Sequence, residues 1–125
     1  MNNSDQNSVI GKGTQRRFPV QVPIMTVSNR VCGLNKTAMK YLRLRPDSGL
    51  MIQINRNKEN PTVYIRLDSQ EPDYRIKVQN GKDNGVINDM PLVKELKSIF
   101  GNGCIRFAID LVQDQRGRHK LNLMS

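Results

Sequence analysis

The stretch "LMIQINRNKENPTVYIRL" (Leu50–Leu67) decides the fold, because two runs of alternating apolar residues flank a short polar loop. Alternation with a period of two is typical of strands that bury one side. The loop, Asn55–Pro61, is short enough to join antiparallel neighbours, so we predict a β-hairpin. The residues expected to share its buried face are Leu50, Ile52, Ile54, Val63, Ile65 and Leu67.

The segment before the hairpin, "NKTAMKYLRL" (Asn35–Leu44), has apolar residues at helical spacing. Asn35 is a favourable N-cap residue, so we predict a helix over Lys36–Leu44. The sequence "RPDSG" (Arg45–Gly49) separates this helix from the hairpin through its Pro and Gly. Further back, "VQVPIMTVS" (Val20–Ser28) has the composition of a strand, with a bend or edge at Pro23.

The chain beyond the hairpin alternates strand and turn signals around one second helix. That helix is predicted over Met90–Phe100, with Asn88 or Asp89 as its cap and Gly101 at its end. The remaining expected elements are a linker at 68–73, a strand at 74–79, a turn at 80–85, a strand at 104–112, a turn at 113–120 and a strand at 121–124.

These elements form two similar halves, residues 18–67 and 74–125, each ordered strand–helix–strand–strand. We therefore predict one α+β domain over residues 18–125, in which the halves share a core. The alternating residues Leu50, Ile52 and Ile54 match Ile105, Phe107 and Ile109. An internal duplication accounts for this match, and so does the general likeness of α+β chains at low residue identity. Both interpretations stay open.

The charge of the chain is concentrated at its beginning. The 125 residues carry a formal net charge of +9, of which residues 1–45 contribute +7 from eight basic residues and one acidic residue. Such asymmetry favours a polyanionic partner, whose counterions are released on binding. The alternative is that the charge only serves solubility. Residues 1–17, rich in Asn, Ser, Gln and Gly, are predicted to be a flexible basic arm.

Residue patterns for catalysis or metal binding are weak. The single histidine, His119, lies in a predicted turn and is expected at the surface, and the two cysteines, Cys32 and Cys104, do not have metal-site spacing. No serine or cysteine lies in a recognisable nucleophile motif. We therefore predict a protein that is not an enzyme and that uses no cofactor and no metal.

The basic residues are the better candidates for a site. Lys36, Lys40 and Arg43 share one side of the predicted helix without an intervening acid, and the helix N-terminus at Asn35 is free to meet a phosphate. The alternative is the ordinary polar face of an amphipathic helix. The turn "RGRHK" (Arg116–Lys120) forms a second basic tip. The predicted nucleic-acid-binding residues are Lys12, Arg16, Arg17, Arg30, Lys36, Lys40, Arg43, Arg45, Arg116, Arg118 and Lys120.

Aromatic residues for stacking on single strands are scarce. The strand aromatics are Tyr64, Tyr74 and Phe107, and the alternation places Phe107 in the core. Duplex DNA is therefore favoured over single strands as the expected partner.

The segment "RVCGLNKTAMKYLRLRPDSGLMIQI" (Arg30–Ile54) resembles the AbrB-type swapped-hairpin transcription factors. The likeness lies in Arg30-Val31, the short cationic helix and the alternating strand after a turn. It departs from the family at Asn35, where Pro is frequent, and at 47–49, where Asp-Ser-Gly replaces Gly-Asp. The resemblance implies an intertwined dimer that binds DNA through a basic surface, with Arg30, Lys36 and Lys40 in or beside it.

We accordingly expect a non-catalytic nucleic-acid-binding protein, with DNA favoured over RNA, that serves as a transcriptional regulator. The alternative is a protein-interaction or assembly module, such as a small structural protein of a phage or mobile element, with further copies of the chain as partners. The sequence shows neither a signal peptide nor an apolar run long enough to span a bilayer. We therefore expect no membrane partner and a cytoplasmic location, at the nucleoid if the protein binds DNA.

Overall fold

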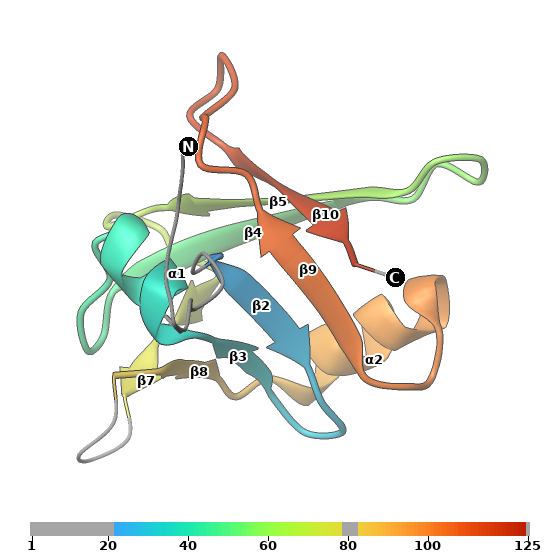
Figure 1. The fold of residues 1–125 in the computed structure, drawn as a ribbon, viewed down its shortest axis with the longest axis horizontal. Coiled ribbons are helices and arrows are strands. Elements are labelled where there is room, and N and C mark those ends of the chain that lie inside the picture. The colour runs from blue at the N-terminus through green and yellow to red at the C-terminus, as the bar shows by residue number, and fades with distance from the viewer. Residues whose placement is uncertain (1–21, 79–82, 125) are drawn as a thin grey trace, which may run out of the picture.

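The computed structural model describes residues 22–78 and 83–124, and their strands form one antiparallel sheet that curls until it nearly closes (Figure 1). The elements are β2 (Ile24–Val27), β3 (Cys32–Leu34), α1 (Lys36–Tyr41), β4 (Gly49–Asn55), β5 (Thr62–Leu67), β6 (Tyr74–Arg75), β7 (Lys77–Val78), β8 (Gly85–Ile87), α2 (Met90–Phe100), β9 (Ile105–Ile109) and β10 (His119–Leu123). The strand order is β6-β4-β5-β10-β9-β2-β3-β8-β7. The expected α+β class is thus confirmed.

The sheet nearly closes because its first and last strands, β6 and β7, are neighbours in the chain. Only the buried Ile76 separates them. The Ile76 N–H donates to the Ser48 carbonyl at 3.0 Å, and the Asp47 N–H donates to the Ile76 carbonyl at 2.9 Å. The strand expected at 74–79 is therefore a bent segment that pairs first with β4 and then with β8.

The predicted hairpin is confirmed as β4 and β5, which pair antiparallel with Ile52 opposite Ile65 and Ile54 opposite Val63. Its alternating apolar residues face the inside of the curled sheet, where Val63 and Ile65 have almost no exposed surface. Leu67 lies at the rim and is 48% exposed. The loop between the two strands extends away from the body of the molecule (Figure 1).

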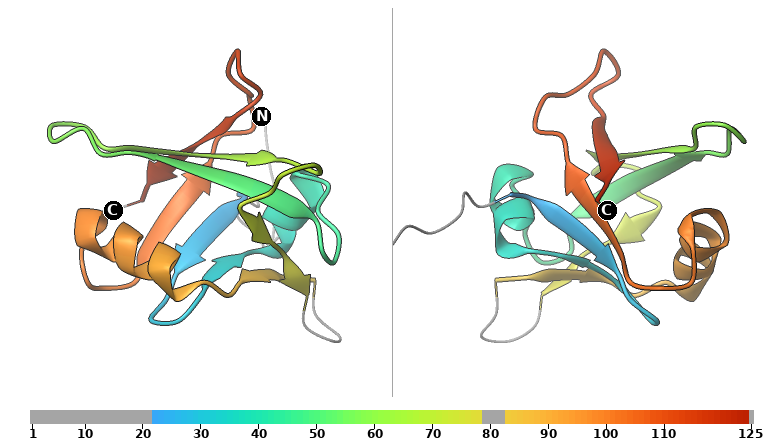
Figure 2. Two further views of the ribbon diagram at one scale, coloured as in Figure 1. Left: turned by 180° about the vertical axis from the view of Figure 1, so that it is seen from behind. Right: turned by 45° about the vertical axis from the view of Figure 1, so that its right-hand side comes forward.

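The core lies inside the curled sheet and is completed by the two helices, which stand at opposite sides of the molecule (Figure 2). Helix α1 contributes Ala38 and Met39, and α2 contributes Leu92, Val93 and Leu96. Burial of these apolar side chains is the main favourable term in folding. Among the described residues, neither helix is long and apolar enough to cross a membrane.

Helix α1 ends at Tyr41, three residues earlier than predicted. Leu42 is its C-cap, and Arg43 has a positive φ of 55°. The Leu44 N–H donates to the Met39 carbonyl at 2.8 Å, and the Arg43 N–H donates to the Lys40 carbonyl at 3.2 Å. This bonding pattern is the Schellman motif, in which a left-handed residue stops a helix. Glycine is usual at that position, so a search for helix-ending Gly misses this end.

Two strands were missing from the prediction, namely β3 and β8, which have three residues each and contain Gly33 and Gly85. Such short strands present too few residues for a period to be recognised. Gly85 begins β8 rather than ending a turn, and residues 79–82 lie outside the described residues. At the other end, β9 stops at Ile109, and β10 begins at His119, two residues before the predicted start of the last strand.

The strand pairings of the first half have counterparts in the second. Strands β2 and β3 form a hairpin before α1, as β7 and β8 do before α2. Strands β4 and β5 form a hairpin after α1, as β9 and β10 do after α2. The halves meet where β2 pairs with β9, β6 with β4, β3 with β8 and β5 with β10. If the bent segment β6–β7 is counted as one strand, each half is ordered strand–strand–helix–strand–strand.

Candidate nucleic-acid interface

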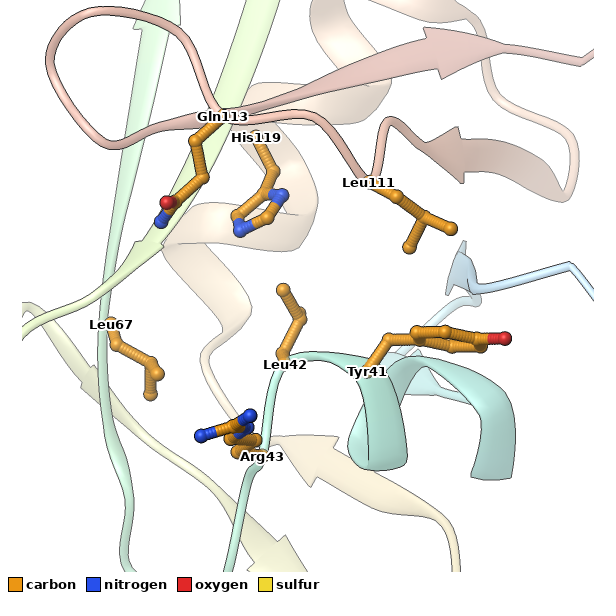
Figure 3. Close-up of a pocket in the computed structure, with 7 residues that line it drawn as sticks. All are labelled: Tyr41, Leu42, Arg43, Leu67, Leu111, Gln113 and His119. Atoms are coloured by element: carbon orange, nitrogen blue, oxygen red, sulfur yellow. The ribbon is translucent and has the colours of Figure 1, made fainter.

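A cleft of about 410 Å³ lies between the end of α1, the end of β5 and the segment 110–119, which joins β9 to β10 and includes the first residue of β10 (Figure 3). We call this segment the 110–119 loop. None of the residues that line the cleft is acidic. They are Tyr41, Leu42, Arg43, Leu67, Leu111, Gln113 and His119. We call this the Tyr41 cleft. The cleft is lined both by Arg43, from the first predicted basic segment, and by the loop that carries the second predicted basic segment (Arg116–Lys120), although about 70 residues separate the two in sequence.

Arg43 is held at the mouth of this cleft by the Schellman end of α1. A left-handed conformation costs a residue other than glycine about 1 kcal/mol. Within residues 22–78 and 83–124, no hydrogen bond or ion pair engages the Arg43 guanidinium. The site therefore has a cation whose donors are available to a ligand.

His119 does not lie in a surface turn, as the sequence suggested, but in the first position of β10 with a half-buried side chain. Its Nδ1 lies 2.8 Å from the Asp110 carbonyl oxygen. A carbonyl only accepts, so Nδ1 carries the hydrogen, and in the neutral ring Nε2 is left as an acceptor. Figure 3 shows His119 and Gln113 reaching into the cleft from the loop side, opposite Leu42 and Arg43.

The 110–119 loop is shaped by the Asp114 carboxylate. Its Oδ1 accepts hydrogen bonds from the backbone N–H groups of Arg116 at 2.9 Å and Arg118 at 2.8 Å. The pKa of Asp114 is lowered, and the largest cause is the backbone hydrogen bond from Arg118. The hydrogen bonds from the Arg118 side chain and from the Arg116 N–H lower it further. On the cleft side, Gln113 Nε2 donates to the Gly117 carbonyl at 3.1 Å. These bonds fix the loop beside the cleft.

On the outer face of β5, Arg118 lies over Tyr64, with its guanidinium carbon 3.8 Å from the ring centroid. Arg118 Nε and Nη2 both contact Asp114 Oδ2 at 2.8 Å, and Nη1 donates to Gln53 Oε1 at 2.8 Å. We call these four residues the Tyr64 cluster. Arg118 was predicted to contact nucleic acid, but in this structure it anchors the loop to the sheet, and its side chain is only 17% exposed.

Arg66 extends the Tyr64 cluster along β5. Its Nη2 lies 3.6 Å from Asp68 Oδ2, and its Nη1 donates weakly to the Arg116 carbonyl at 3.5 Å. In the part of the chain that the structure describes, the buried Arg66 Nε has no hydrogen-bond partner. The side chains of Arg116 and Lys120 remain exposed beside this cluster, and Lys120 stands directly opposite Tyr64 in the strand pairing.

Not all of the other predicted basic residues lie near the Tyr41 cleft. Lys40 and Arg45 are exposed on either side of Arg43 in the chain. Lys36 lies 3.6 Å from Asp83, so an acid does meet this side of α1, although exposed pairs of this kind contribute little free energy. Arg30 lies in the turn between β2 and β3, at the far end of β3 from α1. Lys12, Arg16 and Arg17 lie outside the described residues.

The N-terminus of α1 is not free to meet a phosphate. Asn35 Oδ1 accepts from the N–H groups of Ala38 at 2.8 Å and Ile24 at 3.0 Å, and its Nδ2 donates to the Val22 carbonyl at 2.8 Å. Asn35 is thus the predicted cap, but it also ties α1 to β2. A helix of six residues is moreover too short to read bases along a groove.

Of the residues that line the cleft, only Arg43 was among the predicted site residues. Tyr41 was expected only as part of the predicted helix 36–44, and it is 56% exposed beside Arg43. Gln113 was treated as part of a polar turn. The alternation of β5 did contain a signal for the Tyr64 cluster, because it places Tyr64 and Arg66 together on the outer face.

Comparison of the chain with protein-family models, with curated proteins and with solved structures gives no match.

Proposed function

We propose that this chain is a non-catalytic nucleic-acid-binding protein with DNA as its preferred partner. The observation that carries the proposal is the Tyr41 cleft, at which Arg43 faces the loop that holds Arg116, with no acid in the lining. Cations that are free of internal partners can neutralise phosphates and release counterions. Lys40 and Arg45 extend the same segment. The resemblance of residues 30–54 to the AbrB-type family favours the same class of partner.

The salt dependence of binding tests this proposal. In a mobility-shift titration with duplex and single-stranded DNA at roughly 50 mM salt, we expect a retarded complex, with log affinity falling linearly against log salt. Removing Arg43 and Arg116 as the double variant Arg43→Gln, Arg116→Gln should flatten the duplex slope by about 0.9 per lost phosphate contact.

The matched control removes two exposed cations that lie away from the cleft, Lys58 in the β4–β5 loop and Lys94 on α2. The variant Lys58→Gln, Lys94→Gln changes the net charge equally and should keep the wild-type slope. An absence of complex with both kinds of DNA would overturn the proposal. Equal slopes for the two double variants would mean that net charge, rather than this surface, attracts DNA.

A second candidate function is assembly with other protein chains. It is favoured by Leu111 and Val112, which are 47% and 77% exposed next to each other in the 110–119 loop. Contact of these side chains with another chain would remove apolar surface from water, which is favourable. Light scattering with and without DNA separates the candidates. A fixed oligomer that is indifferent to DNA, and that dissociates in the variant Val112→Ser, favours assembly.

We further propose that the two halves derive from an internal duplication. The repeated order of hairpin, helix and hairpin supports it, as does the pairing of each half with the same strands of the other. Superposition of residues 24–67 on 74–123 in a crystal structure of the protein tests it. A best fit that matches the strands in a different order would contradict it.

A further inference from the structure

We infer that the Tyr41 cleft binds a single unpaired nucleotide, with its phosphate at Arg43 and its base against Tyr41. This inference rests on the proposed function and names the form of nucleic acid that the site accepts. It also departs from the duplex preference that the sequence favoured.

The size and lining of the cleft suit such a ligand. Small-molecule sites typically have a volume of about 300 to 1,000 Å³ and combine apolar walls with a few polar groups. The volume of the Tyr41 cleft, about 410 Å³, lies in this range. Leu42, Leu67 and Leu111 supply the apolar wall, while Gln113 and His119 supply polar atoms on the loop side. A nucleotide is complementary to this lining, since it combines a flat apolar face, a polar edge and an anion.

The polar atoms of the cleft are already oriented by bonds behind them. The Asp110 carbonyl holds the His119 ring through Nδ1, and the Gly117 carbonyl holds the Gln113 amide through Nε2. A base edge that enters the cleft thus meets groups that need little reordering, which reduces the entropic cost of binding. On the opposite side, Arg43 has five N–H donors and no acid beside it in the lining.

The base must be unpaired to occupy this site. In a duplex both faces of a base are stacked and its edge is paired, so neither Tyr41 nor the loop can reach it. Tyr41 is 56% exposed and therefore presents a ring for stacking, which is worth about the same for every base. The six-residue helix α1 acts here as a support for Tyr41 and Arg43 and does not read a groove.

Fluorescence anisotropy of labelled 12-nucleotide probes tests the inference, with oligo(dT), oligo(rU) and a 12-base-pair DNA duplex measured side by side. We expect Tyr41→Ala to weaken binding of at least one single strand by about 5- to 150-fold, the loss typical of one stacked base, and to leave duplex binding unchanged. The slope of log affinity against log salt should not change, because no charge is removed. Whichever single strand shows the loss identifies the ligand as DNA or RNA.

The conservative variant Tyr41→Phe retains the ring and should keep the wild-type affinity. Thermal unfolding of Tyr41→Ala should match that of the wild type, because the side chain is mostly exposed. Unchanged single-strand affinity in Tyr41→Ala would overturn the cleft assignment while leaving nucleic-acid binding intact. Equal losses for duplex and single strands would also overturn it. A wild type that binds none of the three probes would overturn the proposed function itself.

Discussion

The guanidinium of Arg118 covers the ring of Tyr64, with 3.8 Å between the Arg118 Cζ and the ring centroid, while Asp114 and Gln53 hold the guanidinium nitrogens in place. One side chain thereby ties the 110–119 loop to the middle of the β4–β5 hairpin. Because that loop forms one wall of the Tyr41 cleft, the geometry of the cleft depends on a contact on the other side of the sheet.

The variant Tyr64→Leu should lower the free energy of unfolding by about 1 kcal/mol, because it removes the cation–π contact while keeping an apolar side chain. Chemical denaturation followed by circular dichroism measures this change. A double-mutant cycle with Arg118→Ala isolates the contact, and we expect a coupling energy of similar size. Tyr41→Leu, which removes an exposed tyrosine, is the control, and a loss there as large as at Tyr64 would contradict the assignment.

The stability that Asp114 provides should depend on pH. The backbone hydrogen bond from Arg118 and the further bonds from Arg116 and Arg118 lower the pKa of this carboxyl group in the folded state. The ionised carboxylate therefore stabilises the fold above the unfolded-state pKa of about 4, and this contribution is lost as the pH falls through the lower folded-state pKa.

Thermal unfolding of the wild type and of Asp114→Asn between pH 7 and pH 3 checks this expectation. The difference in melting temperature should be constant from pH 7 to about 5 and should shrink below about pH 4. Asp83→Asn, at an exposed carboxylate that faces only Lys36 among the described residues, should differ little from the wild type at any pH. A difference between wild type and Asp114→Asn that grows on acidification would contradict the prediction.

Replacing Asn35 by alanine should destabilise the protein by about 2 kcal/mol, at the upper end of the range for N-cap substitutions. The side chain makes three hydrogen bonds and connects α1 to β2, so its loss leaves more than one backbone group unpaired. Asn88→Ala is the matched control, because the adjacent Asp89, not Asn88, caps α2. Urea denaturation of both variants measures the change in the free energy of unfolding. Equal decreases for Asn35→Ala and Asn88→Ala would show that the caps are misassigned.

Gly49 should not tolerate alanine, although its φ is not in the left-handed region. A Cβ at this position would overlap the Asp68 carbonyl oxygen and the ring of Pro72, so the backbone of the 68–73 segment must shift. We expect Gly49→Ala to cost about 1 to 3 kcal/mol, as for overpacked sites. Gly103→Ala, where a Cβ meets nothing within 4 Å, should lie within about 0.5 kcal/mol of the wild type. Denaturant midpoints for the two variants provide the comparison.

The sequence by itself determined the local elements whose pattern is long enough to read. The alternation of Leu50–Leu67 predicts β4 and β5, and the predicted caps, Asn35 for α1 and either Asn88 or Asp89 for α2, mark the starts of both helices. It also determined the α+β class and the concentration of charge in residues 1–45. These features depend on neighbours in the chain, for which short-range sterics and hydrogen bonds suffice.

Only the tertiary structure decided what lies beside what. The short strands β3 and β8 exist because each pairs with the other and with its own hairpin partner, which no local period reveals. Three features join segments that are far apart in sequence. Ile76 bonds to the 47–48 segment at the bend that closes the sheet, Arg118 packs on Tyr64, and Arg43 lines the same cleft as the 110–119 loop. Such contacts depend on how the whole chain buries its apolar surface, and the candidate site exists only once that burial is complete.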